Sequence, residues 1–257
     1  VLSAIRIGGI AEMYKGTLAS ELVTAANAAG GSLDLQDLQA FKPEWRPTVQ
    51  LKLGSRDAHF APPPAVAGAV EAQMLAMLAE RGRFDGGNSI EKLHVLAESG
   101  LRAFADRMRW MRDDMSASEP LATLVSDPTI DRLTRNFDWQ RHTPPTAFNP
   151  VPVARPENPA ATSFVALDRD GSAVACALTM NNNFGTGRMA RGTGILLAAA
   201  PPPNAQGRGP MSLGPMLVVN SFTKQFFFAA GASGGVAAPT ALINVAAHTL
   251  LDEKPID

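Results

Sequence analysis

The stretch that decides the fold is TSFVALDRDGSAVACALTMNNNFGTG, residues 162–187. It contains two apolar runs, Ser163 to Leu167 and Ala173 to Thr179, joined by the link Asp168 to Gly171. A four-residue link leaves no room for a crossover, and its glycine suits a tight turn, so the pattern predicts two neighbouring antiparallel strands. Neither run alternates with polar residues, so we expect a central sheet that is covered on both faces.

Downstream of this stretch the pattern continues with strands and one helix. Met216 to Val219 and Gln225 to Ala230, which includes three consecutive phenylalanines, are predicted to be strands. The glycine-rich turn Gly231 to Gly235 then leads into an apolar helix from about Ala238 to Leu251. This half is expected to be a sheet with helices packed on it.

The upstream half reads as mainly helical. Apolar spacing predicts a helix over Thr17 to Ala29, closed by a glycine pair, and period-2 alternation predicts a strand over Thr48 to Leu53. A triple proline at 62–64 precedes a second helix, in which Glu71, Gln73 and Glu80 are expected to lie away from the inward face of Val66, Val70, Met74, Met77 and Leu78. A third helix is predicted over Ser89 to Arg112, with an inward face formed by Leu93, Ala97, Leu101, Phe104, Met108 and Met111.

A proline-rich segment separates the two halves. Six of the 20 prolines fall between Pro144 and Pro159, a composition that neither a helix nor a central strand accepts. The expected division is therefore a mainly helical region over 1–143, an extended connector over 144–160, and a sheet-and-helix region over 161–257.

Composition excludes several classes of function. The 257 residues include 23 Lys and Arg against 24 Asp and Glu, so the chain has no basic stripe for nucleic acid, and no apolar run reaches the roughly 20 residues that span a bilayer. The single cysteine and four scattered histidines offer no metal site, and no cofactor is expected. The start at Val1 and the end at Asp257 suggest a segment of a longer precursor whose upstream part is missing here.

Several motifs could carry chemistry, each with a plain structural alternative. Backbone amides of Gly231 to Gly235, at the start of a helix, suit an anion or oxyanion, or simply tight packing. Asn181 to Asn183 at a strand end could fix a substrate or form a polar loop. Glu98, Asp106 and Arg107 could form a buried ion pair or a catalytic dyad, although a solvated face is the usual meaning, and His94 is expected to be a hydrogen-bonded core residue.

Residues 162–187 resemble the start of the small subunit of gamma-glutamyltranspeptidases, with a strand, a D-x-D-G hairpin, a second strand ending in T-x-N, and an F-G pair. Later blocks of that family are resembled, in order, by Gly194 to Leu197, by Pro210-Met211-Ser212 with Pro215, and by Gly231 to Gly235. Upstream, the end of the family's large subunit is resembled by Gly30-Gly31, Leu35 to Leu38, Trp45-Arg46-Pro47, Pro62 to Pro64, and His94 through Arg107. The resemblance covers nearly the whole chain.

The resemblance implies an N-terminal-nucleophile hydrolase: an α+β fold, a four-layer αββα sandwich, incomplete here at both ends. In that family a threonine, exposed by autoproteolysis, uses its own α-amine as base and attacks a γ-glutamyl amide. Carried over by motif, Thr179 would hydrogen-bond the nucleophile, Asn181 would orient its amine or the substrate, and Ser212 would lie near the substrate carboxylate. The amides of Gly234 and Gly235 would form the oxyanion hole and point toward the space beside residue 161.

The nucleophile position departs from the family. Counting back from Asp168 by the family's spacing gives Ala161, where threonine is expected. Alanine has no hydroxyl, so an engineered or natural loss would leave an uncleaved, inactive chain. Thr162 is the weaker nucleophile candidate, because a one-residue shift on a strand turns its side chain to the opposite face.

A second departure follows Leu197. The family places acidic residues there to bind the substrate's α-amino group, whereas this chain has Ala198 to Pro203 without an acid. The usual recognition of a γ-glutamyl group is therefore in question.

Three functions follow as alternatives. The leading one is a gamma-glutamyltranspeptidase-like amidohydrolase or acyltransferase acting on a small amide substrate of the glutathione type, with an acylase of non-glutamyl specificity as a variant. The second is a catalytically dead homologue that acts as a binding or scaffold protein, and the third, a phosphate-binding protein, lacks a nearby Lys or Arg. The resemblance suggests a periplasmic or secreted protein, and the cytoplasm stays open.

Overall fold

A computed structural model describes the chain except for residues 83, 139, 149–158, 201–211 and 257. The chain divides into two compact units that interleave along the sequence. The first comprises Val1–Arg46 and Thr179–Gly209, and the second comprises Pro47–Leu178 and Pro210–Asp257. Each unit is described by itself. The expected division at 143 and 160 stays a prediction, and most of the expected connector lies outside the described residues.

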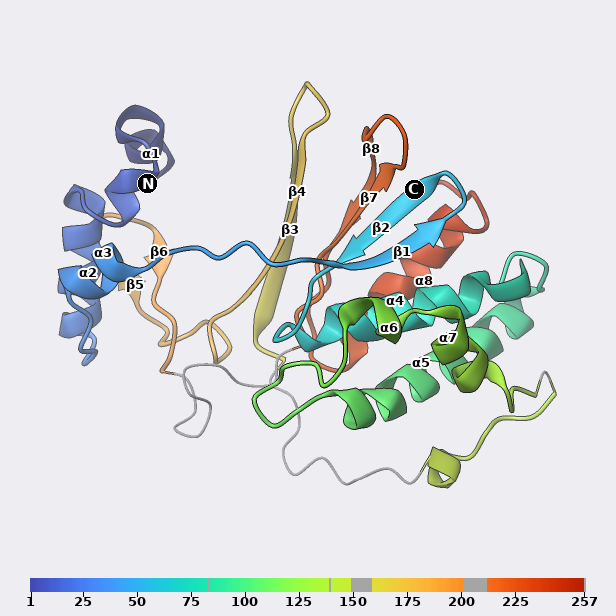
Figure 1. Cartoon of the computed structure of the whole chain (residues 1–257). Coiled ribbons are helices and arrows are strands. Elements are labelled where there is room, and N and C mark those ends of the chain that lie inside the picture. The colour runs from blue at the N-terminus through green and yellow to red at the C-terminus, as the bar shows by residue number, and fades with distance from the viewer. Residues whose placement is uncertain (83, 139, 149–158, 201–211, 257) are drawn as a thin grey trace. The chain divides into compact units, whose positions relative to one another are not determined.

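The second unit is built on a four-stranded antiparallel sheet in the order β1-β2-β7-β8 (Figure 1). The strands are β1 (Val49–Leu53), β2 (Arg56–Phe60), β7 (Met216–Asn220) and β8 (Phe226–Ala230). At one end, Val49 pairs with Phe60, Phe60 with Met216, and Met216 with Ala230. The predicted strands are confirmed, but the sheet joins strands from both halves of the sequence, so the expected separation into a helical and a sheet half is too simple.

Three long helices form the main core with this sheet: α4 (Val66–Ala79), α5 (Ser89–Trp110) and α8 (Ala237–Leu250). Helix α4 contacts β1, β2, α5 and α8, so it is the central element of the unit. The shorter helices are η2 (Glu80–Gly82), α6 (Leu121–Leu124), α7 (Asp127–Thr134) and η3 (Pro145–Phe148). Among the described residues, no helix is long and apolar enough to cross a membrane.

Helix α4 is buried around its whole circumference. Thirteen of its residues, Val66 through Leu78, are buried, including Glu71 at 1% exposure and Gln73 at 0%. The expectation that these two polar side chains lie away from the core is wrong. Because α4 packs against the sheet and two helices at once, no solvent-facing side remains for them.

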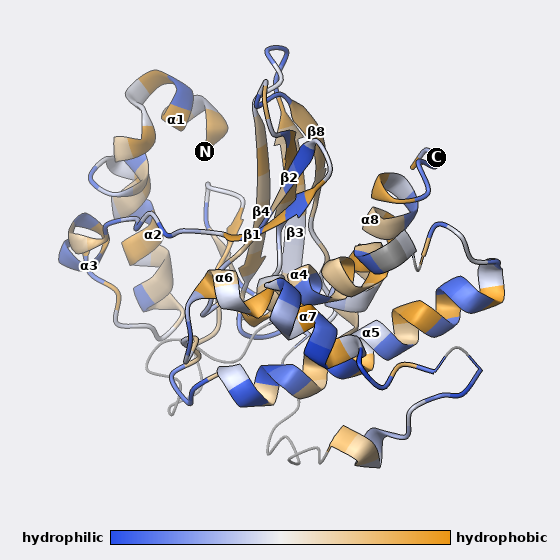
Figure 2. Ribbon diagram, turned by 45° about the vertical axis from the view of Figure 1, so that its right-hand side comes forward, coloured by the Kyte–Doolittle hydropathy of each residue, from blue (hydrophilic) through white to orange (hydrophobic). Residues whose placement is uncertain are grey.

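Helix α5 begins at a capping box in which Asn88 and Glu91 exchange hydrogen bonds with each other's backbone. Its hydrophilic and hydrophobic residues alternate along the helix (Figure 2). The predicted inward face is only partly confirmed: Phe104 and Met111 pack against the core, but Leu93 is 63% exposed. The charged residues Glu98, Arg102, Asp106 and Arg107 are buried instead. Apolar spacing alone did not identify the buried face of α5, because the charged side chains on that face have interaction partners inside the unit.

The hairpin formed by β3 (Ala161–Leu167) and β4 (Ala173–Thr179) confirms the two predicted neighbouring strands. Within it, Asp168 Oδ1 accepts hydrogen bonds from the amides of Asp170 and Ser172 across the turn. The expectation of a central sheet covered on both faces is wrong for this chain, because the hairpin is a separate two-stranded sheet. Its exposed large apolar side chains are Phe164, Val165, Leu167, Val174 and Leu178.

The first unit contains α1 (Leu2–Gly8), η1 (Ile10–Met13), α2 (Thr17–Ala28), α3 (Leu35–Ala40), β5 (Met189–Ala190) and β6 (Ile195–Leu196). The predicted helix over Thr17 to Ala29 is confirmed, and Gly30 ends it at φ 90°. The core of this unit is small, with Leu18, Leu22 and Ala190 at its centre.

Candidate active site

Three segments of the second unit meet at one end of the four-stranded sheet. Met216 begins β7 and pairs with Ala230, the last residue of β8. The next residue, Gly231, abuts the start of β3: a Cβ atom added to Gly231 would lie 2.8 Å from Cβ of Ser163. The glycine-rich turn and the segment that begins at Ala161 are therefore neighbours, as the motif order implies.

The glycine turn requires glycine at two positions. Gly234 has φ 137° and Gly235 has φ 65°, conformations that side chains rarely adopt. The carbonyl of Gly235 accepts a hydrogen bond from the amide of Ala238 in the first turn of α8. The backbone amides thus lie where a helix dipole favours negative charge, and their orientation toward residue 161 stays a prediction.

Ala161 and Thr162 begin strand β3, with Ala161 half-buried and Thr162 exposed. The preceding Ala160 is buried at 6% exposure. Successive side chains on a strand point to opposite faces, so the two candidate nucleophile positions cannot serve the same site interchangeably.

Ser212 is buried at 4% exposure, close before β7. Two residues later, Gly214 packs against the carboxyl group of Glu71 on α4. A Cβ atom added to Gly214 would overlap Oε1 of Glu71 and lie 2.5 Å from Oε2. Burial raises the pKa of Glu71 well above its ordinary value, because the low-dielectric surroundings disfavour the charged form.

In the first unit, Thr179 and Asn181 form a local turn at the end of β4. The hydroxyl of Thr179 accepts a hydrogen bond from the amide of Asn181 at 2.9 Å, and Nδ2 of Asn181 donates to the carbonyl of Ala199 at 2.9 Å. Asn181 has φ 60°, a strained backbone that often marks functional positions. Asn181 thereby joins the strand end to the segment that lacks the expected acidic residues.

The charged residues of α5 form buried networks apart from these motifs. Glu98 accepts hydrogen bonds from Arg102 at 3.0 Å and from the hydroxyl of Thr143 at 2.6 Å. Burial alone would raise the pKa of Glu98, but these bonds outweigh it and hold the pKa below its usual value. Asp106 is bound in the same way by Gln73, Arg109 and Arg132. A buried ion pair is confirmed for each of the two carboxylates, Glu98 with Arg102 and Asp106 with Arg109 and Arg132, and the solvated face is wrong. The catalytic dyad stays a prediction.

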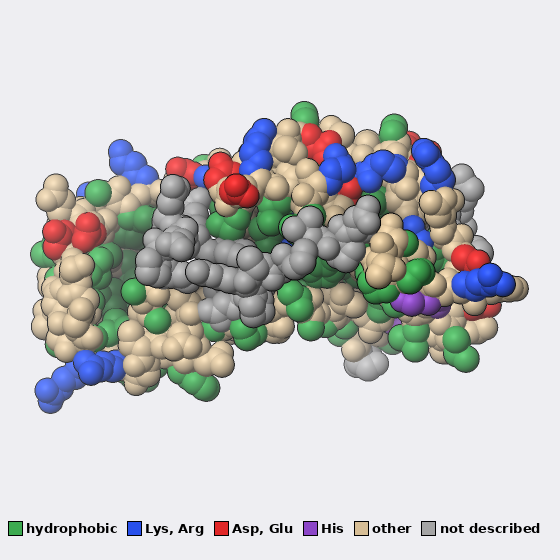
Figure 3. Space-filling model, turned by 90° about the horizontal axis from the view of Figure 1, so that it is seen from below, with side chains coloured by type: hydrophobic (Ala, Val, Ile, Leu, Met, Phe, Trp, Pro, Cys, Tyr) green, Lys and Arg blue, Asp and Glu red, His purple; other side chains and the backbone are tan. Residues whose placement is uncertain are grey.

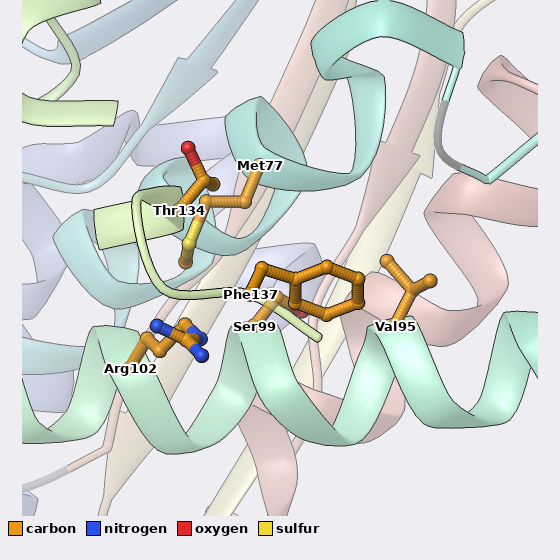
Figure 4. A pocket seen from close by; sticks show the side chains of 6 residues that line it. All are labelled: Met77, Val95, Ser99, Arg102, Thr134 and Phe137. Atoms are coloured by element: carbon orange, nitrogen blue, oxygen red, sulfur yellow. The ribbon is translucent and has the colours of Figure 1, made fainter. Parts of the chain in front are cut away.

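The expected role of His94 is partly confirmed. Its Nε2 lies 2.8 Å from the carbonyl oxygen of Asp138, but its side chain is only half-buried. A small apolar pocket lies nearby, lined by Met77, Val95, Ser99, Arg102, Thr134 and Phe137 (Figure 4). Its residues come from α4, α5, α7 and the following loop, and none is a predicted site residue.

No group of His, Cys, Asp or Glu within the part of the chain that the structure describes could hold a metal ion. On the face shown in Figure 3, Lys and Arg side chains lie among Asp and Glu side chains. This mixed surface differs from the single basic stripe that follows a nucleic-acid backbone.

The family model described as gamma-glutamyltranspeptidase matches residues 1–257. The chain belongs to this family. The glutathione hydrolase proenzyme of Pseudomonas aeruginosa is 32% identical over 201 residues, 76% of this chain and 35% of that protein. The acylase ACY 1 proenzyme of Pseudomonas sp. strain V22 is 28% identical over 197 residues, 76% of this chain and 34% of that protein.

Among solved structures, the cephalosporin acylase from Bacillus halodurans matches 97% of this chain and 46% of its own, with a TM-score of 0.67 and 20% identity. The fold is thus the α+β fold of the N-terminal-nucleophile hydrolases. The chain spans about a third of the length of the curated relatives named above.

Glu71 is the residue that sequence reasoning missed. A signal was present, because Gly214 lies two residues after Ser212 and a glycine there leaves room for a neighbouring side chain. The sequence could not say which side chain fills that room, since α4 and β7 are far apart along the chain.

Proposed function

We propose that this chain is the catalytic part of an amidohydrolase or acyltransferase of the gamma-glutamyltranspeptidase family, in a form that lacks its nucleophile at Ala161. The observation that carries the proposal is the juxtaposition of the glycine turn and the start of β3, where Gly231 abuts Ser163. In this arrangement a hydroxyl at position 161 would begin the strand beside a set of backbone amides suited to a developing oxyanion.

The remaining roles follow the motifs. Gly234 and Gly235 would supply the oxyanion hole, and Ser212 would contact a carboxylate of the acyl group. Thr179 would hydrogen-bond the nucleophile and Asn181 its amine or the substrate. Such a threonine takes the proton of its own hydroxyl with its α-amine, so the group must first be freed by cleavage of the preceding bond.

The acyl group is proposed to carry a carboxylate but to need no ammonium. The segment Ala198 to Pro203 contains no acid that could pair with the amino group of a γ-glutamyl substrate. An unpaired buried ammonium would weaken transition-state binding, which favours an acylase of non-glutamyl specificity.

A non-catalytic binding or scaffold protein is the second candidate. The observation in its favour is the alanine at position 161, which can neither cleave the chain nor attack an amide. The large exposed apolar side chains of hairpin β3–β4 would then serve a partner.

Restoring the hydroxyl tests both candidates. Ala161→Thr should split the protein between residues 160 and 161, as detected by mass spectrometry and N-terminal sequencing. The matched control is Ala161→Val, which has the same β-branched shape without a hydroxyl and should stay intact. If the Thr variant also stays intact, the scaffold function is favoured.

The starting protein provides a further control for Thr162. If Thr162 were the nucleophile, the unaltered protein would already split between residues 161 and 162, and Thr162→Val would abolish that cleavage.

A cleaved Ala161→Thr protein should hydrolyse a glutaryl anilide faster than a γ-glutamyl anilide. The reverse preference would show that an acid elsewhere pairs with the glutamyl ammonium.

A further inference from the structure

Glu71 is a buried carboxyl group that neither the proposed mechanism nor the fold uses. It lies in the middle of α4 at 1% exposure, and within the part of the chain that the structure describes its Oε2 has no hydrogen-bond partner. Leaving a buried polar atom without a partner costs about 1 to 3 kcal/mol, so an apolar residue here would be the cheaper choice for stability alone. Some other property of this position is needed to account for the acid.

The carboxyl of Glu71 packs flat against the main chain at Gly214. Gly214 lies between Ser212 and the start of β7, and Met216 is fixed in the sheet by pairing with both Phe60 and Ala230. Glu71 therefore supports the segment Ser212–Pro215 from the α4 side, at the same end of the sheet as the glycine turn.

We propose that Glu71 is a positioning residue for Ser212, whose carboxyl holds the segment Ser212–Pro215 in the form that takes a carboxylate of the acyl group. This inference rests on the proposed function, which assigns Ser212 to that carboxylate.

The charge state of Glu71 supports this role. Because burial raises its pKa, the uncharged form persists above the ordinary range of a glutamate, and in that form the group does not repel an anion held by the neighbouring segment. Ionised, it would place a like charge beside that anion and weaken binding.

Several charged groups on the elements packed against α4 have partners of their own, and none of those among the described residues bonds to Oε2 of Glu71. The pairs are Glu98 with Arg102, Asp106 with Arg109 and Arg132, Arg107 over the ring of Phe104, Asp57 with Ser221, His59 with Thr48, and His248 with Asp252.

Binding of glutarate, a dicarboxylate without an ammonium, to the unaltered protein tests whether the charge of Glu71 affects the bound anion. By calorimetry, affinity should fall about tenfold or more as the pH rises through the raised pKa of Glu71, a loss of about 1.4 kcal/mol. Glu71→Gln, which cannot ionise, should keep its affinity across this range. Glu253→Gln, at an exposed glutamate, should behave like the unaltered protein, and the neutral probe glutaramide should show no fall in either protein. No glutarate binding, or the same fall in Glu71→Gln, would overturn the inference.

A double-mutant cycle tests the packing. Gly214→Ala should destabilise the protein because the new methyl overlaps Glu71, and the loss should shrink by half or more in a Glu71→Ala background. If Gly214→Ala fails to fold while the double variant folds, the coupling is equally demonstrated, and additive losses would contradict it. The two proposals fail separately: an intact Ala161→Thr chain that binds glutarate as expected would remove the catalytic function but retain the Glu71 site.

Discussion

Helices α4 and α5 lie side by side in the second unit and both bury carboxyl groups, but they do so in opposite ways. Glu98 and Asp106 on α5 are surrounded by cationic and hydroxyl donors, and their pKa values are lowered. Glu71 on α4 has one oxygen without a partner, and its pKa is raised. The carboxylates of α5 therefore have the partners that stabilise their charges, whereas the carboxyl of Glu71 does not. A buried polar group without such partners is a candidate for a functional role.

The same substitution in a buried ion pair and in a partly exposed one gives the largest expected difference. Glu98→Met leaves the guanidinium of Arg102 buried without its carboxylate, so the free energy of unfolding should fall by about 3 to 5 kcal/mol. Urea unfolding monitored by circular dichroism measures this loss. Glu119→Met removes a partly exposed partner of Arg109 and should cost less than about 1 kcal/mol. Equal losses in the two variants would mean that burial does not set the strength of these pairs.

Helix α4 differs from α5 in a second way, because its main chain closely approaches the main chain at Ala61. A Cβ atom added to Gly68 would overlap the carbonyl oxygen of Ala61 and lie 2.8 Å from its amide nitrogen. Because the obstacle is backbone and not a flexible side chain, Gly68→Ala should destabilise the protein by about 1 to 3 kcal/mol despite the better helix propensity of alanine. Thermal unfolding measures the loss, and a variant as stable as the parent would show that α4 can shift away from β2.

Many of the helices and strands were predictable because their signals lie within the segments themselves. Helix α2, strands β1, β7 and β8, and the hairpin β3–β4 appear where apolar periodicity and turn residues predict them. Burial was less predictable, because it depends on what packs against an element. Helix α4 was expected to have a polar face, yet it is enclosed, whereas the hairpin was expected to be covered, yet its Phe164 is 53% exposed.

In the candidate site as well, one feature was predictable from the sequence and another was not. Motif order correctly indicated that the turn Gly231–Gly235 lies near the start of β3. The partner of Gly214 was beyond sequence reasoning, since Glu71 is 143 positions away and looked like a solvent-facing residue on an amphipathic helix. A polar residue on a helix that is enclosed on all sides leaves no periodic signal.

Glu71→Met should have the opposite sign to Glu98→Met. Methionine matches the length and unbranched shape of the glutamate and removes an unpartnered polar atom, so stability at neutral pH should rise by about 1 kcal/mol. The same urea titration compares the two variants. A loss of the size expected for Glu98→Met would indicate that Glu71 has a strong partner.

The pH dependence of stability should differ between the helices as well. Above the ordinary Glu pKa an unfolded chain releases the proton of Glu71 while the folded chain keeps it, so stability should fall as the pH rises toward the raised pKa. This fall should be absent in Glu71→Met. Glu98 and Asp106 act in reverse: their contribution is present above the ordinary carboxyl pKa and is lost as the pH falls through the lowered values. A stability curve of the unaltered protein that shows no fall above the ordinary Glu pKa, or an equal fall in Glu71→Met, would contradict the raised pKa.

The smallest expected effect is a gain in α5, at the glycine that corresponds to Gly68 in the comparison. Gly100 is buried in the helix interior, but a Cβ atom added there would meet only Cε of Met74 at 3.5 Å and Oγ1 of Thr240 at 3.6 Å, which are ordinary contact distances. Gly100→Ala should therefore stabilise the protein by about 0.5 to 1 kcal/mol through reduced backbone entropy of the unfolded chain. Thermal unfolding at a fixed pH resolves a gain of this size when it is run beside Gly68→Ala. If both alanine variants lose stability equally, main-chain contact is not what distinguishes the two helices, and the tight packing of α4 against β2 would have to be reconsidered.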